Sequence, residues 1–189
     1  MKKAVLFFSI LLSTASAFAQ TWSLDKGHSK IAFTVTHHMI SEVDGYFRKF
    51  DAKMTATKDD FSDAVFEMTA ETASINTENE RRDNDLKGEN FFDAANKPTM
   101  SFKSTSFKKV SNGKYKMDGD LTIKGITKPV TLAVTMVGPE PNPNNKKPAV
   151  GIKAVGTINR KDFGLGASMP SALVSEEVEL KATGELQKN

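Results

Sequence analysis

Apolar and polar residues alternate one by one along most of this chain, and few folds accommodate that pattern. In the segment 116–124, Met117, Gly119, Leu121 and Ile123 alternate with lysine, aspartate and threonine. Successive side chains of a β-strand point to opposite faces, so the pattern predicts strands with one buried and one solvated face. Comparable runs lie at 30–37, 43–57, 66–71, 99–109, 130–136, 150–158 and 178–186. The sequence therefore predicts an all-β protein of eight strands.

Turn signals separate these runs. Asn112-Gly113 is a two-residue hairpin signal, and residues 125–129 predict a second reversal. The segment 139–148, rich in proline and asparagine, predicts an exposed loop. An alternating sheet of this size removes its exposed edges by closing, so we expect an eight-stranded, mostly antiparallel barrel.

One segment, between the third and fourth expected strands, does not alternate. Thr77-Glu78-Asn79-Glu80 has the form of a capping box, and the charged residues that follow predict a short helical insertion ending near Phe91-Phe92. Within it, Arg81-Arg82-Asp83 is interpreted as an ion pair that fixes the insertion to the barrel, in preference to an anion site.

The N-terminus predicts export. Lys2 and Lys3 precede an apolar run at 4–12, and Ala17-Phe18-Ala19 is a small-x-small cleavage site. Residues 1–19 are therefore predicted to be a signal peptide and residues 20–189 one domain. The apolar run is too short to cross a bilayer, and no later segment approaches the required length of ~20 residues. We expect a periplasmic protein without a membrane span.

Composition excludes several classes of function. The chain has 26 basic and 23 acidic residues, and removal of Lys2 and Lys3 leaves 24 against 23, so a nucleic-acid partner is not expected. The absence of cysteine excludes thiol chemistry, disulfides and cysteine-ligated metals. Neighbouring residues on a strand point apart, so His37-His38 is not expected to bind one metal ion. We expect no metal, no cofactor and no catalytic residue, since no nucleophile motif is present.

The apolar faces indicate an internal cavity. Large residues such as Phe33 and Phe102 share inward-facing rows with small ones such as Gly119 and Ala154, and four methionines join them. Small residues leave volume, and methionine adapts to a chain-like guest. Tapering barrels also alternate large and small residues to pack solidly, so a filled interior stays open as the alternative.

Several spaced motifs resemble the YceI-like family of polyisoprenoid-binding proteins. The likeness covers essentially all of residues 20–189. The motifs are Asp25, His28-Ser29, Phe33-x-Val35 with His37-His38, Val43-x-Gly45-x-Phe47, Arg82-Asp83, Phe91-Phe92-Asp93, Lys97-Pro98 with Phe102, Gly119-x-Leu121-Thr122-Ile123-x-Gly125-x-Thr127-Lys128-Pro129-Val130, and Asn159-Arg160-x-Asp162-Phe163-Gly164. The family usually has a histidine soon after its Arg-Asp pair, where this chain has Asp85.

The resemblance implies a lipocalin-like barrel that binds a long amphiphile, such as a polyprenyl chain or isoprenoid quinone, in an exported protein that acts as a carrier or reservoir. Such proteins often form dimers, so a homodimer is also expected. His37 is expected to meet a polar head group. The expected lining residues are Phe33, Val35, Phe47, Phe66, Met68, Phe102, Leu121, Ile123, Val134 and Met136, with Phe91, Phe92 and Phe163 closing one end.

Two other functions remain open from the sequence. A filled barrel would serve as a non-catalytic module that docks a protein of the cell envelope through its outer face. An enzyme that modifies envelope lipids is the less favoured alternative, because the motifs single out no catalytic group.

Overall fold

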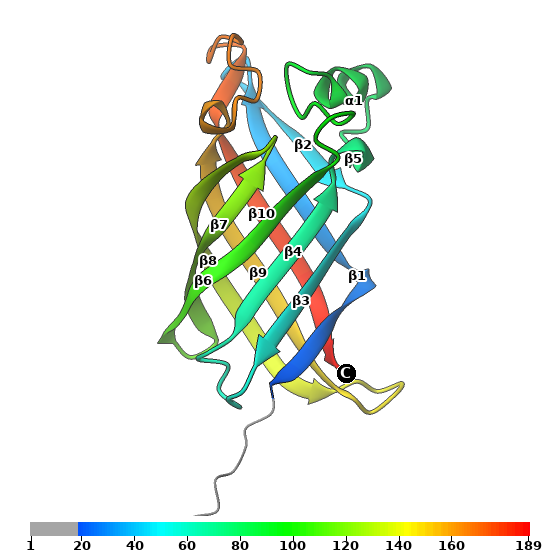
Figure 1. Ribbon diagram of the computed structural model, residues 1–189, viewed down its shortest axis with the longest axis vertical. Coiled ribbons are helices and arrows are strands. Elements are labelled where there is room, and N and C mark those ends of the chain that lie inside the picture. Colours follow the sequence, from blue (N-terminus) through cyan, green and yellow to red (C-terminus); the bar gives the residue numbers. More distant parts are fainter. Residues whose placement is uncertain (1–18) are drawn as a thin grey trace, which may run out of the picture.

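The chain forms one sheet that closes on itself. The computed structural model describes residues 19–189, so the predicted signal peptide lies outside the described part of the chain except for Ala19. Neighbouring strands follow the order β10-β9-β8-β7-β6-β4-β3-β1-β2-β5, and an antiparallel pairing of β10 with β1 closes the barrel (Figure 1). The elements are β1 (Gln20–His37), β2 (Ser41–Phe47), β3 (Phe50–Ala56), β4 (Val65–Glu71), η1 (Thr72–Ser74), β5 (Ile75–Asn76), α1 (Glu80–Lys87), β6 (Thr99–Ser111), β7 (Lys114–Ile123), β8 (Ile126–Pro141), β9 (Pro148–Asn159), η2 (Arg160–Phe163) and β10 (Val174–Lys188).

The closed barrel has eight strand positions, as predicted. β2 and β3 together occupy one position, because β2 pairs with the second half of β1 and β3 pairs with its first four residues. The predicted strand at 43–57 is therefore one bent strand, interrupted at Arg48-Lys49. β5 is a two-residue addition beside β2. The helical insertion lies between β4 and β6, as predicted.

β1 is longer than the alternation predicted. It begins at Gln20, and its pairing with β10 shifts register between Asp25 and Lys30. Before this bulge the inward-facing residues have even numbers, as Trp22 does. After it they have odd numbers, as Phe33 does. A bulge adds residues to one strand only and so reverses its parity. The alternation of the first half was hidden for this reason.

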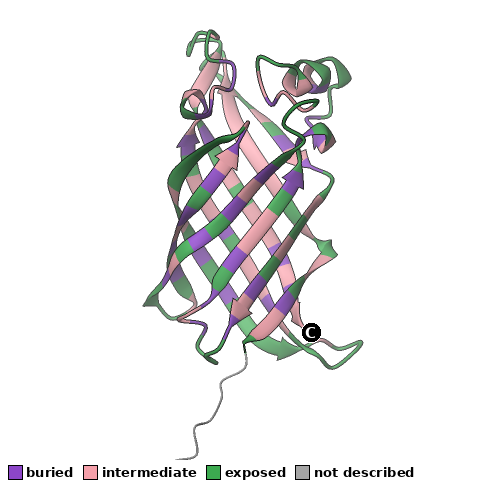
Figure 2. Ribbon diagram, in the orientation of Figure 1, coloured by how far each residue is buried: buried purple, intermediate pink, exposed green. Residues whose placement is uncertain are grey.

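Burial alternates along the other strands as the sequence predicted. In β7, buried Tyr115, Met117, Leu121 and Ile123 alternate with exposed or half-buried polar residues (Figure 2). The Asn112-Gly113 hairpin is confirmed between β6 and β7, and Gly113 has a positive φ of 66°. This conformation suits glycine, which has no Cβ to clash with the backbone.

The two ends of the barrel differ. The lower end in Figure 1 carries the C-terminus, the start of β1, the β3–β4 loop and the β6–β7 hairpin. Four buried aromatic residues of these segments pack in two pairs: Trp22 packs edge-on against Phe61, and Phe107 stacks on Tyr115. The upper end carries the β1–β2 turn, the α1 insertion and the η2 segment. Lys124 Nζ joins the last two, since it donates to the carbonyl oxygens of Glu89 at 2.7 Å and Gly164 at 3.3 Å.

The start of α1 corrects the predicted capping box. Asn79 is the N-cap, and its side-chain oxygen accepts from the backbone N–H of Arg82 at 3.0 Å. Thr77 instead donates its backbone N–H and hydroxyl to buried Asp83. Arg82 Nε donates to the Thr77 hydroxyl at 2.8 Å. Arg82 and Asp83 thus fix the helix through hydrogen bonds to Thr77 and not through the predicted ion pair.

Candidate ligand-binding site

A large cavity occupies the upper part of the barrel. Its volume is about 830 Å³, within the range of 300–1,000 Å³ typical of small-molecule sites. Apolar side chains from all eight strand positions contribute to its wall. The four aromatic residues of the lower end are not among its lining residues. The barrel is therefore packed at one end and hollow toward the other.

Eleven of the fourteen predicted site residues line this cavity. They come from strands far apart in the sequence and from the α1 insertion. The eleven are Phe33, Val35, His37, Phe47, Phe66, Met68, Phe91, Phe92, Phe102, Leu121 and Ile123.

The predicted positions of Val134, Met136 and Phe163 are corrected. Val134 and Met136 face inward, but they lie in the packed lower end, where Val134 pairs with Tyr115 and the Met136 N–H donates to the Gly113 carbonyl. Strand alternation gives the face of a residue and not its height along the barrel. Phe163 is 1% exposed, and the 3₁₀ turn of η2 directs it into the core.

The site also contains residues that were not predicted. β8, β9 and β10 contribute lining residues at positions whose inward parity is visible in the sequence. The segment after η2 contributes others, and no sequence pattern marks them. The unpredicted apolar residues include Val130, Leu132, Ile152, Ala154, Val178, Leu180, Leu165, Met169, Leu173 and Val174.

Polar groups border the upper part of the cavity. The α1 insertion supplies Thr77, Arg82, Asn84, Asp85 and Glu89 to the lining. A cavity with an apolar wall and a few polar groups at one end suits an amphiphile, because the chain is removed from water while the head group keeps its hydrogen bonds. Charged residues of the wall strands also border the cavity: Lys30, Lys53, Glu67 and Lys181.

Arg160 organises the segment between η2 and β10. Its side chain is 3% exposed, and its guanidinium donates to five backbone carbonyl groups. Burial lowers the pKa of Arg160, because a charged group loses its hydration. The five acceptors are the carbonyl oxygens of Leu165, Gly166, Met169, Val174 and Ser175.

His37 lies at the upper end of the cavity beside His38. The two rings have centroids 4.0 Å apart, which corrects the expectation that they point to opposite faces. His38 follows the end of β1 and has a positive φ of 52°, so strand geometry does not apply to it.

Comparison with known proteins identifies the family of this barrel. The family model described as YceI-like domain matches residues 22–186. The chain belongs to the YceI-like family. A UPF0312 protein of Staphylococcus aureus strain N315, SA2479, is 34% identical over 168 residues, covering 87% of this chain and 95% of the relative. The relatives and solved structures named here carry no enzyme name.

Solved structures of related proteins share the fold of this YceI-like chain. BcnA of Burkholderia cenocepacia superimposes with a TM-score of 0.77 at 25% identity, covering 86% of this chain and 98% of BcnA. A YceI protein of Campylobacter jejuni gives 0.71 at 30% identity, covering 79% and 87%. A polyisoprenoid binding domain from Saccharophagus degradans has the same fold, with a TM-score of 0.65 at 12% identity, covering 89% and 98%.

Asp85 is the position where this YceI-like chain departs from the motif quoted above. It is exposed on α1 and lies among the lining residues at the upper end of the cavity.

No helix within residues 19–189 is long and apolar enough to span a membrane.

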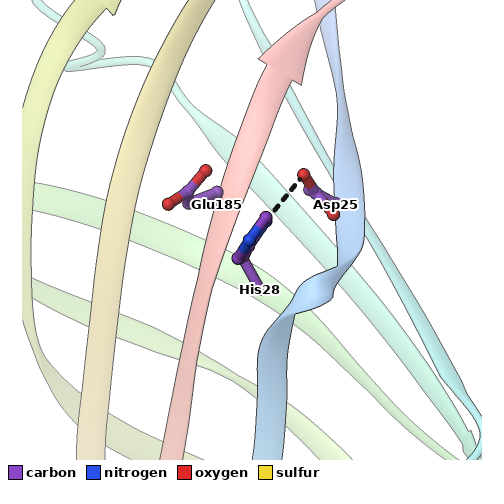
Figure 3. A group of neighbouring side chains, drawn as sticks. All are labelled: Asp25, His28 and Glu185. Atoms are coloured by element: carbon purple, nitrogen blue, oxygen red, sulfur yellow. Dashed lines mark hydrogen bonds and ion pairs between the residues drawn. The ribbon is translucent and has the colours of Figure 1, made fainter. Parts of the chain in front are cut away.

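A separate polar cluster surrounds the bulge of β1. His28 Nδ1 lies 3.1 Å from Asp25 Oδ2, and Glu185 of β10 completes a group whose ligand atoms all lie within 4.8 Å of one another (Figure 3). Such a group has the ligand types that hold a divalent cation. The sequence analysis missed it, since Glu185 is brought to Asp25 by barrel closure. An ordinary ion pair between His28 and Asp25 accounts for their proximity.

This cluster gives a pH-dependent contribution to stability. The hydrogen bond to Asp25 raises the pKa of His28 above 6.5, and the hydrogen bond to His28 lowers the pKa of Asp25 below 3.8. The histidine contribution is present below pH 6.5 and is lost as pH rises through the raised pKa. The aspartate contribution is present above pH 3.8 and is lost as pH falls through the lowered pKa.

We expect His28→Gln to destabilise the protein slightly between pH 3.8 and pH 6.5 and not at pH 9. Urea unfolding of both proteins across this range measures the difference. Both side chains are solvent-accessible, so high salt is expected to reduce the effect. A difference that does not vary with pH would contradict this assignment.

Proposed function

We propose that this protein is an exported carrier or reservoir that binds a long-chain isoprenoid or related amphiphilic lipid, such as a polyprenyl chain or isoprenoid quinone, without catalysing a reaction. The observation that carries the proposal is the cavity of about 830 Å³ with a largely apolar wall. Each CH₂ group moved from water into such a cavity gains ~0.8 kcal/mol, so many weak contacts bind a chain without any charged anchor.

Further support comes from the family and from the polar upper end. The fold is shared with a domain named for polyisoprenoid binding, and the resemblance of the motifs implies the same ligand class. In the proposed complex the chain lies among residues such as Phe66 and Leu121, and the head group lies near His37 and the α1 insertion.

Native mass spectrometry of protein purified from the periplasm, followed by organic extraction, tests this function. A stoichiometric isoprenoid or other amphiphile is expected. A barrel that stays empty after incubation with polyprenyl lipids and quinones would contradict the proposal. The same spectrum counts the subunits and tests the expected homodimer, and N-terminal sequencing tests export, with Gln20 as the expected first residue.

Leu121→Asn is expected to weaken lipid retention about tenfold or more. The side chain is 4% exposed and lines the cavity, so the amide would meet an apolar chain where Leu121 now packs. Ala154→Phe fills the same cavity without adding a polar group and should also reduce retention. Quantification of co-purified or added lipid checks both variants.

Asp120→Asn is the matched control, since Asp120 is exposed on the outer face of the same strand and is not among the lining residues. It should retain lipid as the wild type does. Folding of each variant is checked by thermal unfolding. Full retention by folded Leu121→Asn and Ala154→Phe would place the ligand elsewhere.

A further inference from the structure

The β1–β2 turn presents two large apolar side chains to solvent. Met39 is 74% exposed and Ile40 is 87% exposed, the highest values among the exposed large hydrophobic residues of the described chain. Single exposed apolar residues are common on soluble proteins, but two adjacent ones at the tip of a turn form a local apolar projection. No other part of the described chain buries these two side chains.

The backbone of this turn has an uncommon conformation. His38 and Met39 both have a positive φ, at 52° and 60°, and the Ile40 N–H donates to the His37 carbonyl at 3.2 Å. Residues other than glycine seldom adopt this conformation. In it, both side chains lie exposed at the tip of the turn.

A second apolar segment lies beside the turn. The His38 N–H donates to the carbonyl of Leu173 at 2.9 Å, and Leu173 is 37% exposed. Residues 167–173 carry no charge, and neither do residues 36–41 when the histidines are neutral. We call Met39, Ile40 and Leu173 the apolar rim.

The apolar rim is continuous with the cavity. Leu173 lines the cavity as well as contributing to the rim, and its neighbours Met169, Val174 and His37 also line it. Arg160 anchors the segment that carries Leu173 through its bonds to the Met169 and Val174 carbonyls. The rim therefore lies at the hollow end of the barrel, opposite the end filled by Trp22 (Figure 1).

We propose that the apolar rim inserts into the surface of a phospholipid bilayer while the protein takes up or releases its ligand. This inference rests on the proposed function. A water-insoluble ligand resides in a membrane, and a rim continuous with the cavity shortens its path through water. Three side chains cover far less than the ~800 Å² per partner of a typical protein interface, and a small apolar surface fits weak, reversible insertion at a bilayer surface better.

The charge distribution favours apolar insertion over attraction to anionic lipids. The two segments that form the rim contain no lysine or arginine. Membrane binding through basic residues requires a cluster of them and is weakened by salt. Binding is therefore expected to neutral vesicles and to change little with ionic strength.

Vesicle flotation with Met39→Ser/Ile40→Ser tests this surface. The wild type should bind vesicles of phosphatidylcholine. The double variant should bind them at least about tenfold more weakly, since two apolar side chains no longer enter the bilayer. Val110→Ser/Val137→Ser is the matched control. These valines are 70% and 68% exposed and lie toward the lower end of the barrel, so this control should bind as the wild type does.

A second readout separates this proposal from the proposed function. Ligand capacity is measured at equilibrium with a polyprenol delivered from detergent, and the transfer rate is measured from loaded vesicles. The rim variant should keep its capacity and lose transfer rate by a similar factor. Absence of ligand in every assay would contradict the proposed function, whereas the flotation result would still decide whether the rim binds a bilayer.

Three results would contradict the proposal that the apolar rim inserts into a bilayer. One is wild-type protein that does not float with vesicles, which would favour a protein acceptor. Another is equal weakening by the rim variant and the valine control. The third is binding that requires phosphatidylglycerol and disappears with salt, because this would point to charge and not to the apolar rim.

Discussion

Replacing Arg160 with alanine is expected to lower the free energy of unfolding by about 3 kcal/mol or more. Hydrogen bonds to a charged group contribute about 1.5–3 kcal/mol each, and five carbonyl groups lose their donor together. The carbonyls of buried Leu165 and Gly166 have no ready access to water in the folded barrel. Urea unfolding followed by circular dichroism measures the change.

Arg160→Lys tests the geometry of this arrangement. An ammonium group has three donors on a flexible chain, whereas the guanidinium presents five in a plane. Lysine should therefore recover only part of the lost stability. Lys161→Ala is the matched control, because its pair with Glu176 is partly exposed and should contribute at most about 1 kcal/mol. Equal effects of Arg160→Ala and Lys161→Ala would contradict the structural role of Arg160.

Gly119→Ala is expected to cost about 1–3 kcal/mol of stability, the usual range for overpacking a core. A Cβ at this inward-facing position would overlap Phe102 Cζ and lie 2.6 Å from the Lys103 carbonyl oxygen. Phe102 lines the cavity, so a displaced ring would take up cavity volume, and the carbonyl belongs to the paired strand β6. Thermal unfolding measures the cost, and reduced lipid retention is expected with it.

Gly151→Ala provides the comparison. Gly151 also lies inside a strand, but a Cβ there meets nothing within 4 Å. Since glycine weakens a strand by about 0.5–1 kcal/mol relative to alanine, this variant should be neutral or slightly more stable. Destabilisation of equal size at both positions would show that the close approach of Phe102 is not the cause.

Local pattern was sufficient to predict the strands and their faces. Leu121 and Phe66 were placed on the inner face because side chains alternate along a strand wherever no bulge intervenes. The hairpin at Asn112-Gly113 was predictable for the same reason, since a two-residue turn depends on the conformations of its own residues. Eight of the ten lining residues expected from this alternation line the cavity.

Features that depend on distant contacts were not predictable. Val134 and Leu132 share a face, yet only Leu132 lines the cavity, because aromatic residues from other strands fill the barrel around Val134. The capping box failed for a local reason: Arg82 and Asp83, five and six residues after Thr77, bind the polar groups of Thr77 and leave Asn79 to cap the helix.

The sequence by itself determined which residues of the regular strands face inward, the eight strand positions of the barrel, and where the helical insertion falls, because the patterns that mark them involve residues a few positions apart. The tertiary structure alone decided where the cavity ends, what Arg160 binds, and that Glu185 lies beside Asp25. Glu185 reaches Asp25 only when the last strand closes against the first, which joins residues about 160 positions apart. Arg160 binds carbonyls 5 to 15 positions away, but they lie in a segment without a repeating pattern, so its fold is not visible in the sequence.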